Sequence, residues 1–122
     1  MIPKFITSIR DGKPPVIFGD GEQTRDFTFV ANVVQANLGA CRAGEEALGG
    51  AYNIGCGERI SLNDLVKSLG RLTGKQIRAE HVDPRAGDVR HSLASIDLAG
   101  SRLGFRPEVD LIEGLKRTLE AY

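Results

Sequence analysis

The strand-like segments of this chain are short compared with its helical segments, and this imbalance restricts the possible folds most. Residues that favour β-structure form runs of only three to six residues, at 16–18, 24–29, 51–54 and 77–82. Longer segments with apolar residues at helical spacing lie between them. Alternating helices and short strands predict an α/β fold, a small mixed domain with about five helices. The apolar faces of the helices need more sheet to pack against than these segments supply.

Start and stop signals predict the helices. The clearest helix begins after Ser61, which forms a start like a capping box with Asp64, and it ends at Gly74. The other helices are expected from Pro3 to Gly12, over 30–43, over 97–103 and from Leu111 to Tyr122. No repeat, low-complexity tract or linker interrupts residues 1–122, so we expect a single domain.

Charge and hydropathy exclude several kinds of partner. The chain has 16 Lys and Arg residues and 16 Asp and Glu residues, so no overall electrostatic attraction to nucleic acid is expected. No apolar run approaches the roughly 18 residues that a membrane-spanning helix needs. The first residues also lack the basic stretch and long apolar region of a secretory signal. We therefore expect a cytoplasmic protein without a nucleic-acid or membrane partner.

Neither the cysteines nor the histidines form a recognised catalytic or metal-binding motif. Cys41 and Cys56 lack the spacing of metal ligands and are expected to be reduced packing residues. His81 and His91 have no nucleophile at a recognisable spacing, so structural or solvated roles are favoured. These side chains predict no metal site and no catalytic residue.

Gly55-Cys56-Gly57 follows a strand-like segment and precedes a helix, as the glycines of a dinucleotide-binding loop do. The third glycine of that motif is absent. A turn that needs positive φ explains the two glycines without any ligand, and this interpretation is favoured.

Three arginines are candidate ligands for an anion. Arg25, Arg85 and Arg90 lie in or near glycine-rich loops and close to Asp26 and Asp88. A guanidinium group matches phosphate oxygens in both geometry and charge. Spacing alone favours solvated surface arginines, so the residues by themselves indicate only an α/β domain suited to anions.

Three motifs follow one another along the chain: GDGEQTRDF at 19–27, YNIGCG at 52–57 and RAGDVRHS at 85–92. In this order they closely resemble the C-terminal portion of the extended short-chain dehydrogenase/reductase family. The branch that they resemble most is the NAD-dependent nucleotide-sugar epimerases and dehydratases, of UDP-glucose 4-epimerase type. The likeness runs from residues 2–6 to the last helix. It implies the C-terminal part of that fold, a nucleotide-sugar-binding domain without the Rossmann half.

The resemblance implies a UDP-sugar or a related nucleotide sugar as ligand, and it assigns residues by motif position. Arg25 and Arg85 would hold the diphosphate. Asp88 would accept hydrogen bonds from the ribose hydroxyls. Phe18 and Leu62 match positions near the nucleotide or its base.

The chain departs from the family pattern in two respects. Family members usually carry an acid where this chain has Ala31-Asn32, so the contact or cap made there is expected to differ. The NAD-binding motif Gly-x-x-Gly-x-x-Gly and the catalytic motif Tyr-x-x-x-Lys are both absent from these residues. Arg90 fits the third motif, but a ligand contact and a structural ion pair both remain open for it.

Two functions follow from the resemblance. The first is the substrate-binding half of an NAD-dependent UDP-sugar 4-epimerase, an isomerase that needs its NAD-binding half for activity; NAD would then be bound by the full-length family and not by this chain. The alternative is a non-catalytic module that binds nucleotide sugars or another protein. The resemblance also implies apolar surface on helix 30–43 and strand 51–54, and hence pairing with an N-terminal Rossmann half or self-association as a homo-oligomer.

Overall fold

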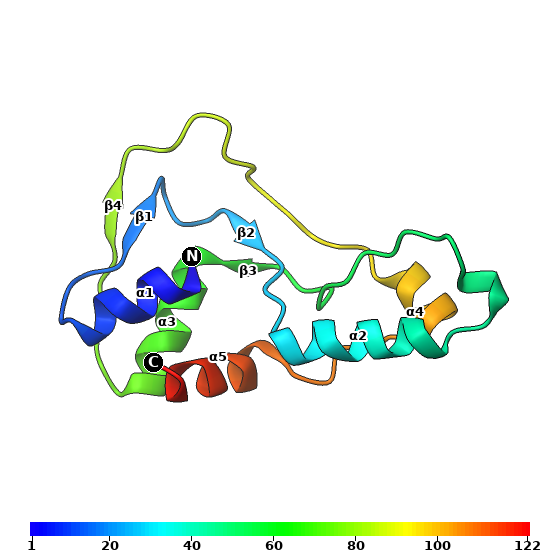
Figure 1. The fold of residues 1–122 in the computed structure, drawn as a ribbon. Helices are drawn as coiled ribbons and strands as arrows, with labels where there is room; N and C mark the ends of the chain where they lie inside the picture. Colours follow the sequence, from blue (N-terminus) through cyan, green and yellow to red (C-terminus); the bar gives the residue numbers. More distant parts are fainter.

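Five α-helices and four very short strands make up the fold of residues 1–122 in a computed structural model (Figure 1). In chain order the elements are α1 (Ile2–Arg10), β1 (Val16–Phe18), β2 (Thr24–Arg25), α2 (Val30–Arg42), the 3-10 helix η1 (Glu45–Ala47), β3 (Ile60–Ser61), α3 (Leu62–Thr73), β4 (Glu80–Val82), α4 (Asp97–Leu103) and α5 (Leu111–Glu120). All five expected helices are present, which confirms the small mixed α/β class.

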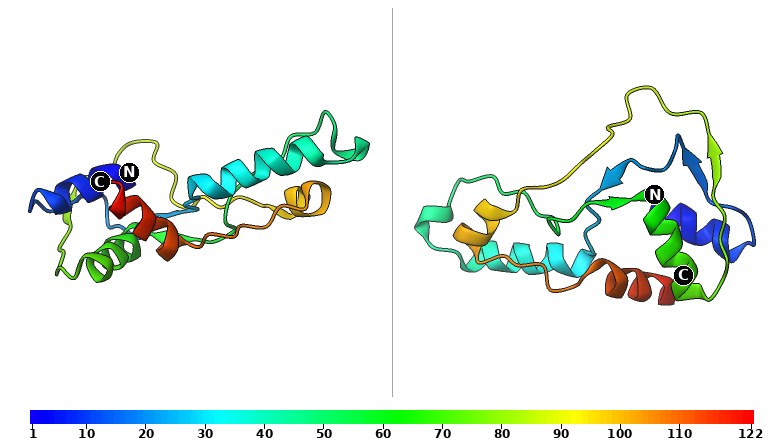
Figure 2. Two further views of the ribbon diagram at one scale, coloured as in Figure 1. Left: turned by 60° about the horizontal axis from the view of Figure 1, so that its bottom comes forward. Right: turned by 180° about the vertical axis from the view of Figure 1, so that it is seen from behind.

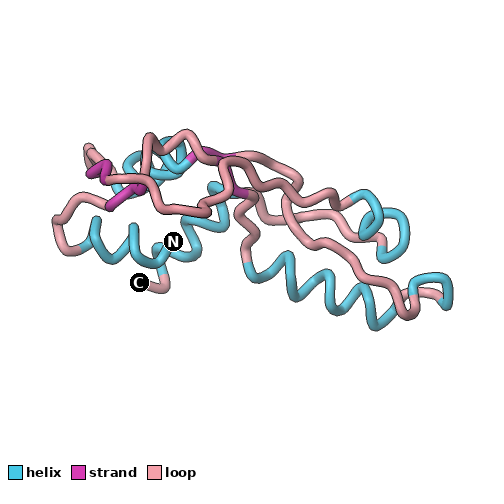
Figure 3. Tube along the Cα trace, turned by 90° about the horizontal axis from the view of Figure 1, so that it is seen from above, coloured by secondary structure: helices cyan, strands magenta, loops and turns pink.

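The elements form two lobes that lie end to end (Figures 1 and 2). The larger lobe contains α1, α3 and α5 with β1 and β4, and most of the nine buried apolar side chains of its core come from α1 and α3. The smaller lobe contains α2, η1 and α4 around a cluster of Ala36, Ala99 and Phe105. Extended segments of chain connect the two lobes (Figure 3). The larger lobe is therefore the better packed platform for a site.

Helix α3 forms for the reasons that its sequence indicates. The Ser61 hydroxyl oxygen accepts a hydrogen bond from the Asp64 backbone N–H at 3.0 Å, and the same hydroxyl donates to the Asp64 carboxylate at 2.8 Å. Gly74 ends the helix with a φ of 66°, which only glycine adopts readily. Leu62, Leu65 and Leu69 of the apolar face are buried in the larger core. The predicted helix start is confirmed, although the Asp64 carboxylate bonds the Ser61 hydroxyl rather than the Ser61 backbone N–H of a full capping box.

Two separate strand pairs replace the thin sheet that the sequence suggests. β1 and β4 are parallel, with Val16 opposite Glu80, and β2 and β3 are antiparallel, with Thr24 opposite Ser61. The expected strand at 24–29 keeps only its first two residues, and the expected strand at 77–82 keeps only its last three. Neither β3 nor η1 was expected from the sequence.

The prediction of a strand at 51–54 is wrong. This segment pairs with no strand of the chain and is extended without ladder hydrogen bonds. Its side chains pack on the smaller cluster instead, where Tyr52 and Ile54 are half-buried. The Tyr52 hydroxyl donates a hydrogen bond to the Ala47 carbonyl at 2.8 Å. Apolar residues in an extended segment therefore serve packing here rather than a sheet.

Asn32, one of the two residues that stand where the resembled family usually has an acid, is a buried hydrogen-bonding residue of α2. Its side chain is 1% exposed. The amide oxygen accepts from the backbone N–H groups of Glu108 and Val109, both at 3.0 Å, and the amide nitrogen donates to the Val109 carbonyl at 2.8 Å. Asn32 thus fixes α2 to the segment that leads into α5.

Helix α2 also exposes an apolar face. Val30, Val34 and Leu38 are four residues apart and are 64%, 51% and 51% exposed. A single exposed apolar residue is ordinary, but a row of them along one helix face is typical of a contact surface. The longest helix has 13 residues, and no helix combines the length and the apolar content that crossing a membrane requires.

Candidate functional site

A cavity of about 610 Å³ opens in the larger lobe between α1, β1, the start of α3 and the loop that follows β4. We call residues 83–92 of this loop the strap. Eleven residues line the cavity: Met1, Lys4, Phe5, Ser8, Val16, Ile17, Phe18, Gln23, Leu62, Arg85 and Asp88. Four of the five predicted site residues are among them, although they come from β1, α3 and the strap.

Phe18 and Arg85 form one wall of this cavity. The Arg85 guanidinium carbon lies 3.8 Å from the centroid of the Phe18 ring, which is the geometry of a cation–π contact. Phe18 is fixed at the end of β1, since its carbonyl accepts a hydrogen bond from the Gln23 side chain at 2.6 Å. Arg85 lies on the exposed strap, so this contact holds an exposed arginine side chain against a fixed ring.

Asp88 connects the cavity with Arg25. Asp88 lines the cavity, and its carboxylate accepts a hydrogen bond from Nη2 of Arg25 at 2.5 Å. Nη1 of Arg25 donates to the Thr24 carbonyl at 2.7 Å, which orients the guanidinium toward the strap. Arg25 itself is not a lining residue. Arg25, predicted to hold the diphosphate, and Asp88, predicted to bind the ribose, therefore lie next to each other and form an ion pair in this structure.

Leu62 has a packing role. Its side chain is 3% exposed and belongs to the larger core, and it forms part of the cavity floor. Apolar packing explains its position fully, so the predicted nucleotide contact remains a prediction.

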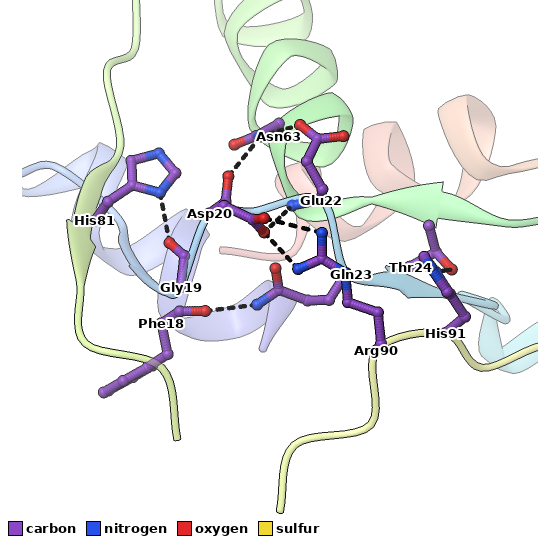
Figure 4. A network of polar contacts seen from close by, with 10 residues as sticks. All are labelled: Phe18, Gly19, Asp20, Glu22, Gln23, Thr24, Asn63, His81, Arg90 and His91. Carbon is purple, nitrogen blue, oxygen red and sulfur yellow. Dashed lines mark hydrogen bonds and ion pairs between the residues drawn. The ribbon is translucent and has the colours of Figure 1, made fainter. Parts of the chain in front are cut away.

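Arg90 forms a structural ion pair (Figure 4). Its two terminal nitrogens donate to the two carboxylate oxygens of Asp20 at 2.8 and 2.9 Å. The hydrogen bond from Arg90, and after it the one from the Glu22 backbone N–H, holds the pKa of Asp20 below its ordinary value. Of the two roles left open for Arg90, the structure shows the ion pair.

The two histidines also have structural partners, as the sequence suggests. Nδ1 of His81 lies 2.8 Å from the Gly19 carbonyl oxygen, and Nδ1 of His91 lies 3.0 Å from the Thr24 hydroxyl oxygen (Figure 4). The first contact joins β4 to the 19–22 turn, and the second joins the strap to β2.

The Gly55-Cys56-Gly57 loop binds a carboxylate of the chain itself. The backbone N–H groups of Cys56 and Gly57 each donate to Asp26 at 2.9 Å. A Cβ atom on Gly55 would lie 2.6 Å from the Asp26 carboxylate, which explains why glycine stands there. Burial, and then the charge of Asp26, raises the pKa of the Cys56 thiol. The loop amides are thus engaged within the protein and do not fit a dinucleotide pyrophosphate.

Three polar residues that line the cavity were not singled out from the sequence. Lys4 and Ser8 are four residues apart on α1, on the side next to the apolar face, and Gln23 is a buried polar residue between β1 and β2. Lys4 and Ser8, a polar pair at helical spacing, could have indicated from the sequence that this side of α1 faces a polar site. No group of three or more His, Cys, Asp or Glu side chains is arranged to hold a metal ion.

Comparison with known proteins finds this chain similar to one part of several longer epimerases and dehydratases. The sequence profile of the NAD dependent epimerase/dehydratase family matches residues 1–55. A putative UDP-glucose 4-epimerase of Methanocaldococcus jannaschii is 40% identical over 119 residues, which are 98% of this chain and 37% of the relative. The dTDP-D-glucose 4,6-dehydratase of Bos taurus is 36% identical over 130 aligned residues, covering 100% of this chain and 36% of the relative.

Solved structures show the same partial correspondence. The UDP-glucose 4-epimerase of Thermotoga maritima with UDP-glucose superposes with a TM-score of 0.90 at 39% identity, covering 98% of this chain and 38% of that protein. The UDP-glucuronic acid 4-epimerase of Bacillus cereus, in complex with UDP-glucuronic acid and NAD, superposes with a TM-score of 0.91 at 29% identity, over 98% and 38% of the two chains. This chain therefore spans a little over a third of the length of the relatives that it matches.

Proposed function

Because this chain is related over its whole length to one portion of the NAD-dependent epimerase/dehydratase family, we propose that it is a nucleotide-sugar-binding domain. The whole protein would be an NAD-dependent UDP-sugar 4-epimerase, with residues 1–122 as its substrate-binding half. The observation that carries this proposal is the cavity that brings together Phe18, Leu62, Arg85 and Asp88, with Arg25 on its rim.

The chemistry of this cavity suits a nucleoside diphosphate. Its volume of about 610 Å³ lies within the usual range for small-molecule sites. The Phe18 ring offers a flat apolar surface to a base, and the Asp88 carboxylate can accept hydrogen bonds from neighbouring ribose hydroxyls. Arg25, Arg85 and Lys4 add positive charge for a diphosphate. An aromatic ring, a carboxylate and cations at one cavity match the three parts of such a ligand.

The residues of this chain bind and orient but do not carry out hydride transfer. NAD would supply that chemistry in the proposed enzyme, and the structure of the similar Bacillus cereus enzyme contains NAD. The Gly55-Cys56-Gly57 loop does not fit NAD, because its amides hold Asp26. No Tyr-x-x-x-Lys sequence occurs among the 122 residues. In the proposed enzyme, the NAD-binding residues and the catalytic tyrosine therefore belong to the portion of the relatives that this chain does not cover.

The partner surface proposed for that part is the apolar face of α2. Val30, Val34 and Leu38 are exposed along it, and Ile112 of α5 is exposed as well. Burying such side chains stabilises an interface by roughly 25 cal/mol for each Å² of apolar surface. We propose that an NAD-binding half covers this face in the assembled protein, with self-association of the isolated chain as the alternative.

A non-catalytic module is the second candidate function. The observation that favours it is the Ala31-Asn32 pair, which stands in place of the usual acid and whose Asn32 side chain is hydrogen-bonded within the domain. Mixing the chain with the NAD-binding half of a relative, and assaying UDP-sugar interconversion after the complex is demonstrated, separates the two functions. No interconversion in an assembled complex would favour the module.

Calorimetric titration with UDP-glucose tests the binding site directly. We expect the parent chain to release heat on binding, and Arg85→Ala to weaken binding by roughly 10- to 100-fold, as the loss of a charge-assisted contact does. Arg106→Ala is the matched control, because Arg106 is exposed and lies outside the cavity. Equal affinities for the two variants, or no heat from the parent chain, would refute the proposed site.

A further inference from the structure

The strap carries Arg85 and Asp88 to the cavity, but it has no apolar anchor. Every residue from 83 to 93 is exposed. A loop without buried side chains depends on polar contacts for its position. The strap begins at β4, where the Gly19 backbone N–H donates to the Val82 carbonyl at 2.8 Å. Its other end must therefore be fixed by polar contacts to the 19–25 segment.

Those contacts gather at Arg90 and its neighbours. The Arg90 carbonyl accepts a hydrogen bond from the Thr24 N–H at 2.9 Å, and the Ser92 N–H donates to the Thr24 carbonyl at 3.1 Å. The Arg90 side chain adds the two-pronged ion pair with Asp20. The Arg25–Asp88 pair holds the middle of the strap through a single nitrogen, whereas the two-pronged Asp20–Arg90 pair fixes direction as well as distance near its end.

Asp20 is itself held rigidly. Its carboxylate accepts from the Glu22 N–H at 3.0 Å, and its carbonyl accepts from the Asn63 side chain at 3.0 Å, which ties the turn to α3 (Figure 4). The ion pair thus connects the strap to the packed larger lobe. Neither Asp20 nor Arg90 lines the cavity.

We propose that the Asp20–Arg90 ion pair is a latch that positions the strap, so that Arg85 and Asp88 are held at the cavity before a ligand arrives. Asp20 and Arg90 are positioning residues in this proposal, because they act on the ligand only through the strap. The inference rests on the proposed nucleotide-sugar site for its effect on binding, but the positioning of the strap can be measured without any ligand.

Limited proteolysis of the ligand-free chain measures the latch. Trypsin cleaves after Arg85 in proportion to the time that the strap is displaced, when opening is fast relative to cleavage. Asp20→Asn keeps every tryptic site and can still accept the Glu22 N–H, so it removes little besides the ion pair. We expect cleavage at Arg85 to become about three- to five-fold faster, the range for a well-formed exposed pair.

Glu113→Gln is the matched control. Glu113 accepts from Arg117 on α5 at 2.7 Å, and the two side chains are exposed to a similar degree as Asp20 and Arg90. Adding Arg90→Gln to Asp20→Asn should not speed cleavage at Arg85 further, because the ion pair is already lost. The single variant Arg90→Lys should also be cleaved faster than the parent chain, because lysine cannot form the two-pronged contact with Asp20.

UDP-glucose titration of the same variants measures the effect on binding. We expect a Kd about three- to five-fold higher for Asp20→Asn, and no further rise when Arg90→Gln is added to it. Cleavage of Asp20→Asn at the rate of Glu113→Gln would overturn the latch, whatever the ligand does. Faster cleavage with an unchanged Kd would overturn its role in binding. A parent chain without affinity for UDP-glucose would refute the proposed function, while the cleavage rates would still decide the positioning of the strap.

Discussion

Replacing Asn32 by alanine should destabilise the domain more than replacing any other asparagine of α2, because Asn32 has backbone partners that nothing else can satisfy. The substitution removes one donor and one shared acceptor. Glu108 is exposed, so water can replace the lost acceptor at its N–H. Val109 is buried, and both its N–H and its carbonyl would lose their partner.

The size of the effect follows from those two groups. Leaving a buried donor or acceptor unsatisfied costs about 1–3 kcal/mol. Two such groups give a loss of about 2–4 kcal/mol, since the residual cavity admits some water. That loss is a large part of the roughly 5–15 kcal/mol that stabilises a domain. Urea unfolding followed by circular dichroism should therefore show a clearly lower midpoint at an unchanged slope.

Two further variants make this measurement decisive. Asn37 lies on the exposed side of the same helix, so Asn37→Ala should change stability by less than about 0.5 kcal/mol. Asn32→Asp keeps the acceptor for both N–H groups and places a negative charge in the first turn of α2, so it should cost less than alanine. If Asn32→Ala unfolds at the same urea concentration as Asn37→Ala, the reasoning from buried partners is refuted.

Three other results are expected. Iodoacetamide at pH 8 should modify exposed Cys41 several-fold faster than Cys56, because burial raises the pKa of the Cys56 thiol. Unfolding in urea should remove this difference, and equal rates in the folded protein would contradict the burial of Cys56. The hydrogen bonds from Lys67 and Ser61 hold the pKa of Asp64 below its ordinary value. The ionised carboxylate therefore stabilises the fold above about pH 4, and this contribution is lost as the pH falls through the folded pKa. In Asp64→Asn the unfolding free energy should fall less steeply at acid pH than in the parent chain. Gly55→Ala should destabilise by about 1–3 kcal/mol in thermal unfolding, because its Cβ would lie 2.8 Å from the Ala94 Cβ, whereas Gly100→Ala on α4, with its nearest contact at 3.6 Å, should be tolerated.

The helices were predictable from the sequence because their signals are local. Ser61, Asp64 and Gly74 lie within α3 or next to it, and each acts on the helix that contains or borders it. The strands were predicted less well, since a strand needs a partner whose position depends on the whole fold. Residues 51–54 have the composition of a buried strand, yet no strand of this chain lies beside them.

The candidate site was predictable in its members but not in its contacts. The order of the motifs selected Phe18, Arg85 and Asp88, which the fold places at one cavity. The cation–π contact between Arg85 and Phe18 depends on the path of the strap, and no local pattern encodes that path. The pairing of Arg25 with Asp88 likewise joins residues 63 positions apart.

One short segment, residues 20–26, explains why three separate motifs belong to one structure. Successive side chains of an extended backbone point to opposite sides. Arg25 reaches the strap, and Asp26, the next residue, reaches the amides of the glycine loop. Thr24 pairs with the strap through its backbone, while Asp20 holds Arg90. The first motif is therefore the common partner of the other two, and a substitution in it should disturb both the cavity and the connection to the smaller lobe.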